Sequence, residues 1–506
     1  MYNENMKNTT FRLKPFILLF SLMLVVSFCF DTTKEGLWNP AYLFWPLVFL
    51  IVFLSLRKSI IYSEDTILYV IMLTGILIKT AYVLYTAIYT RQHDVIDFGV
   101  GEGHAGYIEY IYFNNSLPQG DPREKWAFFQ PPLHHIIAAL WMKFCNKFTH
   151  VYRQLQENVQ ALTLFYTAAV EVFSLFICRE LKLKKKGMIA ALLIISIHPV
   201  FILMSGSINN DALSLVLSLA CFYFLIRWYK EGGLFRIILI ALTLGLSMLA
   251  KLSGGMIAPA VAFVFLLKLI REDKKGRLTC LLHYFIFAII VFPLGIGWEI
   301  RNMISYGMPF NYIPPVGEIL EKRDFISRFL DIRTNSIYPS MVAYNDPYDE
   351  YNIIVALFKT AIFGEYDFGR LMPAINAFAL PLFITSVLLA MLALLSMILT
   401  LAKSVKDREF SIKRDNPADI KWTLFIYYIT MLGAYFSFAF KSDNFSAQDF
   451  RYIAGVIVVQ SLFLAMFRAE IEDKSLPARS IDVLCLGFGI FAVLVYIMLG
   501  FSVKAG

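Results

Sequence analysis

Long apolar runs recur along the chain and are separated by short segments that hold most of the charged residues. Most of these runs have the length that crosses a membrane, for which a helix needs about 20 residues. We therefore predict an all-α polytopic membrane protein with about thirteen transmembrane helices. The predicted spans are 13–30, 41–56, 66–89, 158–178, 187–204, 208–228, 235–250, 254–270, 279–299, 374–401, 422–440, 453–467 and 481–502.

Composition supports this prediction. Hydrophobic residues make up 58% of the chain and charged residues only 17%, whereas soluble domains average about 45–50% and 25%. The first run follows Arg12 and Lys14 as in a signal peptide, but no small-residue cleavage site follows it. We therefore expect a retained first span. The six cysteines are scattered without a CxxC pair, which argues against a disulfide framework or a zinc site.

Lys and Arg residues gather between the apolar runs, so the net charge of +8 fits orientation in the membrane better than nucleic-acid binding. Six basic loops fall on one side of the predicted topology, and clustered Lys and Arg mark the cytoplasmic side. We expect a cytoplasmic N-terminus and an outer C-terminus. The six loops are Arg57-Lys58, Lys182 to Lys186, Arg227 to Lys230, Arg271 to Arg277, Lys403 to Lys421 and Arg468 to Arg479.

Two long segments, 90–157 and 300–373, fall on the opposite, outer side of one multi-span membrane domain. Connections of this length are usually functional or disordered. Both are rich in aromatic residues, so we expect ordered outer loops with amphipathic helices packed on the membrane surface. Chemistry at the outer face is therefore the working hypothesis.

The first outer loop opens with acidic residues and a histidine. Asp94 follows the third predicted span directly, and Asp97, Glu102 and His104 come within ten residues of it. A solvated charge beyond a span explains Asp94 as simply as a catalytic role does. A divalent metal on these four residues stays open, but their spacings match no standard ligand pattern, and no cofactor is predicted.

Two short helices are expected in the same loop. Residues 104–113 have the apolar period of an interfacial helix, with Tyr107, Tyr110 and Tyr112 as candidate anchors. Pro131-Pro132 precedes a second helix over 133–146, because proline fits the first helical turn. That helix is too short for a full span. It carries His134 and His135, of which at least one is expected to be structural.

Four segments together resemble the membrane-embedded glycosyltransferases of the GT-C superfamily, in particular the family 39-type branch. That branch includes protein O-mannosyltransferases and lipid A aminoarabinose transferases. The resemblance covers about 90–460 in order. Its segments are the acidic residue, Tyr-bearing helix and Gln130-Pro131-Pro132-Leu133 of the first loop; His198-Pro199 with Ser205 to Leu213; Trp298 to Asn302 with Tyr306 to Pro309; and Gln448 to Tyr452.

The resemblance implies transfer of a sugar from a polyprenyl-phosphate donor to an acceptor on the outer face. A carboxylate takes the proton of the attacking hydroxyl, and cations stabilise the leaving lipid phosphate. The family often has an adjacent Asp-Glu pair in the first loop, which is missing there. Asp94 is therefore the first candidate for the base and Glu102 the second.

Arg451 is the first candidate for the phosphate, because guanidinium grips phosphate oxygens in a bidentate way. An interfacial arginine with no ligand is the alternative. Arg301 and Lys251 are reserve phosphate ligands. Asn210 and Asp211 could equally cap a helix, and Glu365 could be a solvated charge. Further residues expected at the substrate cavity are His104, Tyr107, Gln130, His134, Asn210, Asp211, Glu365 and Tyr452.

Other functions stay open at this point. A transporter or flippase for lipid-linked sugars would place charges deep within spans, of which Lys79 and Glu171 are the clearest. A polysaccharide polymerase or ligase would share the lipid-phosphate chemistry, and a non-catalytic scaffold would need none of it. The expected partners are the polyprenyl-phosphate sugar, membrane lipids and a lipid, protein or cell-wall acceptor, in a bacterial plasma membrane.

Overall fold

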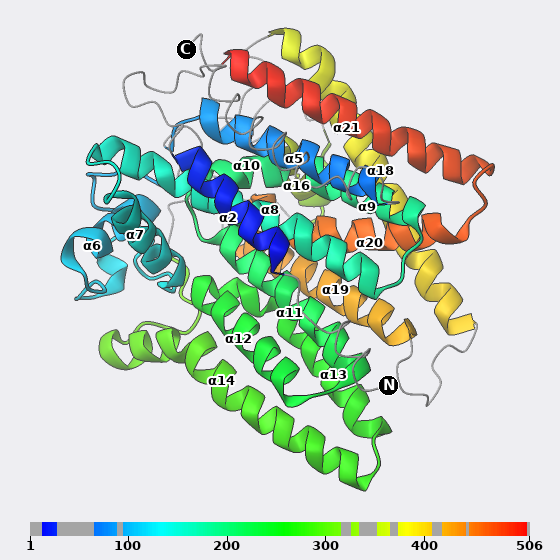
Figure 1. The fold of residues 1–506 in the computed structure, drawn as a ribbon, viewed down its shortest axis with the longest axis horizontal. Helices are drawn as coiled ribbons and strands as arrows, with labels where there is room; N and C mark the ends of the chain where they lie inside the picture. Colours follow the sequence, from blue (N-terminus) through cyan, green and yellow to red (C-terminus); the bar gives the residue numbers. More distant parts are fainter. Residues whose placement is uncertain are drawn as a thin grey trace.

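The computed structural model describes residues 13–27, 65–88, 95–314, 325–332, 352–364, 373–406, 417–441 and 445–502. These residues form helices and connecting turns, with no strand among them. The longer helices lie side by side with similar tilts, and α6 and α7 sit at one end of the bundle (Figure 1). The predicted all-α fold is therefore confirmed.

The helices follow the predicted apolar runs. The α-helices are α2 (Lys14–Ser27), α5 (Thr66–Tyr85), α6 (Gly103–Asn114), α7 (Leu133–Cys145), α8 (Tyr152–Glu180), α9 (Lys185–Ile197), α10 (Pro199–Gly206), α11 (Asp211–Glu231), α12 (Leu234–Ala250), α13 (Ala258–Arg271), α14 (Lys274–Tyr306), α15 (Ser327–Leu330), α16 (Ile353–Phe363), α18 (Pro373–Lys406), α19 (Pro417–Lys441), α20 (Gly455–Glu470) and α21 (Leu476–Ser502). Short 3-10 turns are η1 (Pro122–Glu124), η2 (Leu252–Ile257), η4 (Phe445–Gln448) and η5 (Phe450–Ile453).

Within the described residues, eight helices are long and apolar enough to cross a membrane, or nine if the bent pair α9 and α10 is one span. Three predicted spans are shorter helices: α2 with 14 residues, α12 with 17 and α20 with 16. The predicted span 41–56 lies outside the described residues. A multi-pass membrane protein is thus confirmed, whereas the count of thirteen is not.

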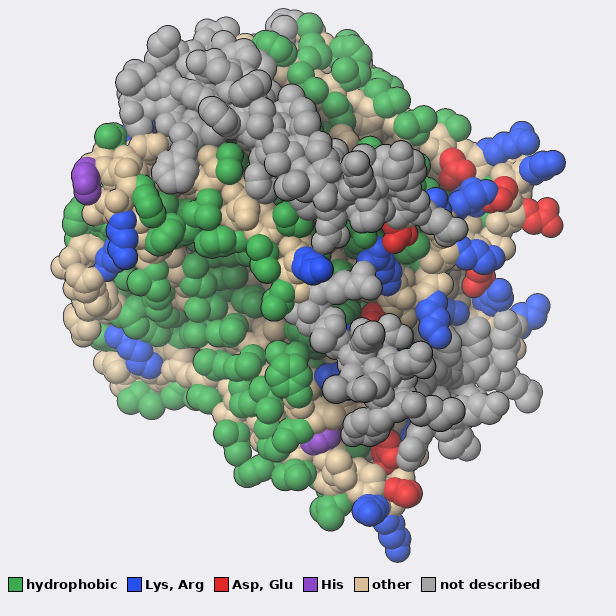
Figure 2. Space-filling view, viewed as in Figure 1, with side chains coloured by type: hydrophobic (Ala, Val, Ile, Leu, Met, Phe, Trp, Pro, Cys, Tyr) green, Lys and Arg blue, Asp and Glu red, His purple; other side chains and the backbone are tan. Residues whose placement is uncertain are grey.

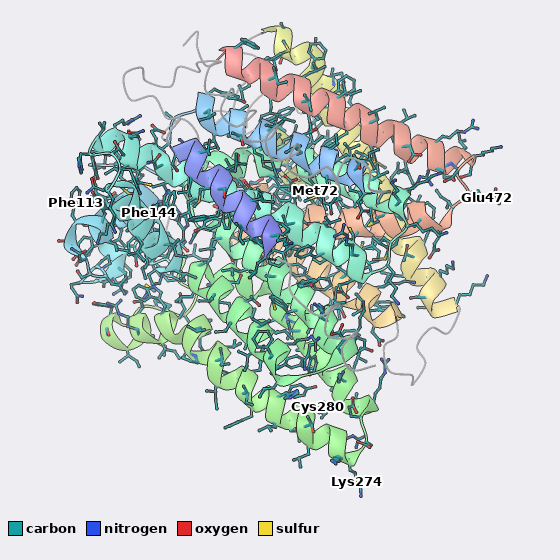
Figure 3. The ribbon with its side chains drawn as sticks, viewed as in Figure 1. Met72, Phe113, Phe144, Lys274, Cys280 and Glu472 are labelled. Atoms are coloured by element: carbon teal, nitrogen blue, oxygen red, sulfur yellow. The ribbon has the colours of Figure 1, made fainter. Side chains whose placement is uncertain are left out.

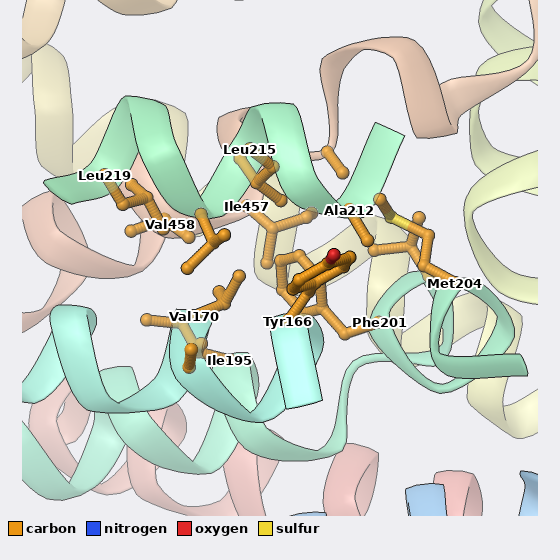
Figure 4. Close-up of a cluster of buried hydrophobic side chains, with 14 of the residues drawn as sticks. Tyr166, Val170, Ile195, Phe201, Met204, Ala212, Leu215, Leu219, Ile457 and Val458 are labelled. Atoms are coloured by element: carbon orange, nitrogen blue, oxygen red, sulfur yellow. The ribbon is translucent and has the colours of Figure 1, made fainter. Parts of the chain in front are cut away.

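The bend of 41° between α9 and α10 occurs at His198-Pro199. Proline lacks the N–H that would continue the helix. The backbone N–H of Val200 instead donates to His198 Nδ1 over 3.2 Å, which caps α10. The bend lets α10 pack on α8 and α11, where Tyr166, Phe201, Met204, Ala212 and Leu215 form part of a buried apolar cluster (Figure 4).

Ion pairs join the ends of many helices at the end of the bundle away from α6 and α7. Lys230 at the end of α11 contacts Glu180 of α8 over 3.0 Å, and Lys403 of α18 contacts Glu470 of α20 over 2.9 Å. Lys186 pairs with Asp473, and Arg271 with Asp419. In Figure 2 charged side chains gather along this edge, whereas apolar side chains cover much of the middle. The described basic loops therefore share one end.

Candidate active site

The larger described cavity has a volume of about 700 Å³ and lies at the end of the bundle where α6 and α7 sit. Its walls come from residues 126–131, the η2 turn, the end of α14 with residues 308–314, the end of α19 and η5. Aromatic side chains line much of it. Its titratable lining residues are His104, Lys251, Glu299, Tyr312, Lys441 and Tyr452.

Lys251 reaches the cavity from the turn that follows α12. Its Nζ lies 2.5 Å from Asp211 Oδ1 and 4.5 Å from the centre of the Tyr452 ring. The adjacent Asn210 donates from Nδ2 to the carbonyl of Ala250 over 2.8 Å, which holds the start of α11 against this turn. Lys251 is therefore a cation with a defined position in the cavity wall.

Gly254 keeps this turn close to α11. A Cβ at Gly254 would lie 2.7 Å from the hydroxyl oxygen of Ser214, closer than real contacts allow. Ser247 of α12 also donates to the carbonyl of Ser214 over 2.7 Å. The short Ala-Lys-Leu-Ser-Gly sequence is thus explained by tight packing that fixes Lys251 next to Asp211.

Arg451 lies beside this pair, but behind the cavity wall. It is 4% exposed, with Nε 3.1 Å from Asp449 Oδ2 and 3.8 Å from Asp211 Oδ2. Its Nη2 donates to the Tyr452 hydroxyl over 3.3 Å. Tyr452 lines the cavity and Arg451 does not. The fold therefore brings together Asp211, Lys251, Arg451 and Tyr452, all singled out in the sequence.

A second, apolar cavity of about 300 Å³ shares α19 and η5 with the larger one. It lies among α9, α16, α18, α19, α20 and α21, and most of its lining is Ile, Leu, Phe, Met and Val. Helix α19 contributes Phe436 to this cavity and Phe438 to the larger one, while η5 contributes Phe450 and Tyr452 respectively. Arg451 therefore stands, in sequence, between one side chain of each cavity.

Histidines of α6 and α7 form a buried stack next to the larger cavity. His104 Nδ1 lies 2.9 Å from His135 Nε2, and the Tyr107 ring stacks on His135 with centroids 4.1 Å apart. His134 donates from Nε2 to the carbonyl of Ile208 over 2.8 Å. Burial lowers the pKa of His134 to about 4 and that of His135 well below its usual value, so both are neutral.

This stack corrects one expectation. Tyr107 is fully buried between His135 and Phe128, so its prediction as an interfacial anchor is wrong. Its neighbours in the helix, Tyr110 and Tyr112, are only partly buried. Of the residues expected at the cavity from this region, His104 and Gln130 line it, whereas Tyr107 and His134 support it from behind.

The other predicted residues are dispersed. Asp94 and Glu365 lie outside the described residues. Glu102 is exposed at the N-terminus of α6 and does not line the larger cavity. The Arg301 guanidinium lies 4.6 Å from the Trp298 ring centre and donates to Asn302, also outside the cavity lining. Asn210 lies 3.5 Å from Gln130, behind the wall.

Two charged residues of the cavity were not singled out in the sequence: Glu299 and Lys441. Glu299 stands in the Trp298 to Asn302 segment that carried the family resemblance, and its place at the outer end of a predicted span was an available signal. Trp298 donates from Nε1 to the carbonyl of Phe129 over 3.3 Å, which ties α14 to the opposite wall. In the described part of the chain, no group of three His, Cys, Asp or Glu could hold a metal ion.

Comparisons with known proteins bear on the whole site. Residues 112–309 match the family model described as oligosaccharyl transferase STT3, N-terminal. No curated protein matches the sequence significantly. Among solved structures, ArnT from Cupriavidus metallidurans bound to undecaprenyl phosphate is similar with a TM-score of 0.49 and 10% identity, over 87% of this chain and 77% of that chain.

The arabinofuranosyltransferase AftD from Mycobacteria is similar with a TM-score of 0.46 and 12% identity, over 87% of this chain and 27% of that chain. Because both TM-scores are below 0.5, neither likeness supports a conclusion about function. The STT3 match is a match of sequence, and its range includes α7 of the first loop, the Lys251 turn and Glu299, but only the last three residues of α6. This match confirms the resemblance of the chain to the membrane-embedded glycosyltransferases of the GT-C superfamily.

Proposed function

We propose that this protein is a membrane glycosyltransferase that moves a sugar from a polyprenyl-phosphate donor to an acceptor at the outer face. The observation that carries the proposal is Lys251, a cation in the wall of a cavity of about 700 Å³ that shares α19 and η5 with an apolar cavity of about 300 Å³. A lysine there suits the phosphate, and the apolar cavity suits the first part of the lipid chain. The match to a transferase family supports the same class of reaction.

In the proposed reaction, the acceptor hydroxyl attacks the anomeric carbon of the sugar and the lipid phosphate leaves from the opposite side. Negative charge then develops on the phosphate oxygens, where a fixed cation stabilises it. Lys251 is 2.5 Å from Asp211, so the phosphate would take over part of this ion pair. Arg451, close to both Asp211 and Asp449, would hold Asp211 in place as Lys251 turns to the phosphate.

The transporter alternative loses its main sequence support. Lys79 and Glu171 are both fully buried and pair with each other, and Lys79 also donates to the carbonyl of Ser196 over 2.8 Å. Neither residue lines either cavity described above. The pair therefore neutralises itself between helices instead of facing a pathway.

Transfer from radiolabelled polyprenyl-phosphate hexoses and pentoses tests the proposal, with purified protein in detergent and a membrane extract as the source of acceptor. We expect wild type to transfer the labelled sugar to the acceptor, and Lys251→Met to lose this transfer. Parallel assays of Asp94→Asn, Glu102→Gln and Arg451→Ala examine the residues predicted from the sequence. If no donor gives product while the folded protein binds the carrier lipid, the result favours the transporter hypothesis over the transferase hypothesis.

A further inference from the structure

Glu299 differs from the other buried carboxylates in the described part of the chain. Five Asp or Glu residues there are buried: Glu157, Glu171, Asp211, Glu299 and Asp419. Four of these have a cationic partner. The pairs are Glu157 with Arg153, Glu171 with Lys79, Asp211 with Lys251, and Asp419 with Arg271. Among the described residues, no ion pair is found for Glu299.

The nearest cation along the helix does not neutralise Glu299. Arg301 is two residues away, but its guanidinium lies over the Trp298 and Tyr306 rings, 4.6 Å and 5.3 Å from their centres, and bonds Asn302. The one hydrogen bond found for the Glu299 carboxylate in the described residues is from the backbone N–H of Asn311, 3.3 Å from Oε2. A buried carboxylate with so little compensation is costly, and such groups are concentrated at functional sites.

Of the described residues that line the larger cavity, Glu299 is also the one carboxylate. It is 4% exposed and stands on α14, whereas Lys251 enters the cavity from the η2 turn. A sugar transfer needs these two kinds of group: a cation for the leaving phosphate and an acceptor for the hydroxyl proton. The cavity wall therefore supplies both from different elements.

We propose that Glu299 binds the attacking hydroxyl of the acceptor and takes its proton during sugar transfer, an assignment that rests on the proposed function. The acceptor O–H bond breaks with its proton going to the Glu299 carboxylate, and the acceptor oxygen bonds the anomeric carbon. The bond from that carbon to the phosphate oxygen breaks, and its electron pair stays on the phosphate beside Lys251. Glu299 takes this role in place of Glu102, which does not line the cavity.

The cavity also indicates the class of hydroxyl that Glu299 would receive. Phe129 and Tyr312 contact each other edge to face, with centroids 5.6 Å apart, and both line the cavity with Trp126 and Phe310. Flat aromatic faces suit the C–H faces of a sugar ring, while a carboxylate accepts hydrogen bonds from its hydroxyl groups. The acceptor group is therefore a sugar hydroxyl.

The test compares wild type, Glu299→Gln, Glu299→Asp and the control Glu124→Gln, which removes an exposed carboxylate outside the cavity lining. Labelled polyprenyl-phosphate sugars are the donors, and a glycolipid fraction and a delipidated protein fraction of the membrane are separate acceptors. Loss of a general base lowers kcat by about 100-fold or more. We expect that loss in Glu299→Gln, partial activity in Glu299→Asp, and wild-type activity in Glu124→Gln.

The pH profile separates a proton acceptor from a structural residue. We expect the acidic limb of kcat/KM to disappear in Glu299→Gln, because glutamine does not titrate, and to remain in Glu299→Asp. His104, Lys251, Lys441, Tyr312 and Tyr452 also line the cavity, and a limb due to any of them would persist in Glu299→Gln. Size-exclusion profiles in detergent identify any variant that fails to fold. If Glu299→Gln does not fold, the activity of Glu299→Asp tests the assignment instead.

Several outcomes would overturn the assignment. An active wild type with Glu299→Gln within threefold of its kcat would leave the proposed function standing and refute the role of Glu299. The same holds if the acidic limb persists in Glu299→Gln and is lost in Asp94→Asn. Transfer to the protein fraction at residues without sugar would refute the sugar-hydroxyl acceptor. A folded wild type that transfers from no donor would refute the proposed function and this assignment together.

Discussion

Lys251 and Arg451 have the same charge but different surroundings. The Lys251 side chain is 14% exposed, lines the cavity and, within the described part of the chain, pairs with one carboxylate, Asp211. The Arg451 side chain is 2% exposed and lies close to two carboxylates, Asp211 and Asp449. A lysine with one partner can exchange it for a phosphate, whereas an arginine close to two carboxylates in the interior keeps its position. Replacement of Lys251 is therefore expected to affect activity, and replacement of Arg451 to affect stability.

Replacement of Lys251 by Met should reduce transfer and leave the fold intact. Loss of one group that stabilises the developing charge lowers kcat by about 100- to 1,000-fold. Initial rates with labelled donor measure the effect, and Lys147→Met, an exposed lysine outside the cavity lining, is the matched control. Equal rates for Lys251→Met and wild type would remove Lys251 from the phosphate site.

Replacement of Arg451 by Ala should destabilise the protein, because it removes a buried cation that lies close to both Asp449 and Asp211. Breaking a buried ion pair on one side costs about 3–5 kcal/mol. The free energy of unfolding in SDS titrations measures this cost. Arg451→Ala with Asp449→Asn should recover part of it, since the negative charge nearest the lost guanidinium is removed as well. A fully stable Arg451→Ala that has lost donor binding would instead favour direct phosphate binding by Arg451.

At the level of helices, buried polar contacts hold α5 in place among apolar neighbours. Lys79 of α5 pairs with Glu171 of α8 and bonds the carbonyl of Ser196 in α9. Gly75, one turn earlier, lies against Ser196 so closely that a Cβ would clash with its backbone. Small residues allow membrane helices to approach closely. The glycine and the ion pair therefore fix the same three-helix junction.

Lys79→Met should destabilise this junction, because the Glu171 carboxylate stays fully buried without its cation. We expect a loss of about 3–5 kcal/mol in the free energy of unfolding. Lys79→Met with Glu171→Met should recover most of the loss, since both charges are gone. Lys403→Met breaks an exposed pair with Glu470 and should cost less than about 1 kcal/mol. Equal losses in the single and double variants would show that the charges are not responsible.

At the scale of the whole molecule, the two ends of the bundle differ in chemistry. One end carries the basic loops and their ion pairs, whereas the other carries α6, α7 and the larger cavity. Phe113 and Phe144 lie at the cavity end, opposite Lys274 and Glu472 (Figure 3). Because clustered Lys and Arg remain in the cytoplasm, the cavity end is predicted to face outward.

Labelling of single introduced cysteines tests this orientation. Ser116 and Glu472 are exposed at opposite ends. We expect Ser116→Cys to react with a membrane-impermeant maleimide in intact cells, and Glu472→Cys only after permeabilisation. The five described native cysteines are buried, and Cys29→Ala without an introduced cysteine gives the background. Labelling of Glu472→Cys in intact cells would reverse the topology and exclude transfer at the outer face.

The sequence by itself determined the helices, because insertion into a membrane depends on the length of an apolar run and on the charges beside it, and both are local properties. It also singled out Asp211, Lys251 and Arg451 as residues with chemistry. Only the tertiary structure decided their environments, since Asp211 and Lys251 meet across 40 residues of chain. It buried Tyr107, placed Arg451 behind the wall and left Glu299 in the cavity without an ion pair among the described residues. Burial and ion pairing depend on neighbours that are distant in the chain, and local sequence patterns do not identify those neighbours.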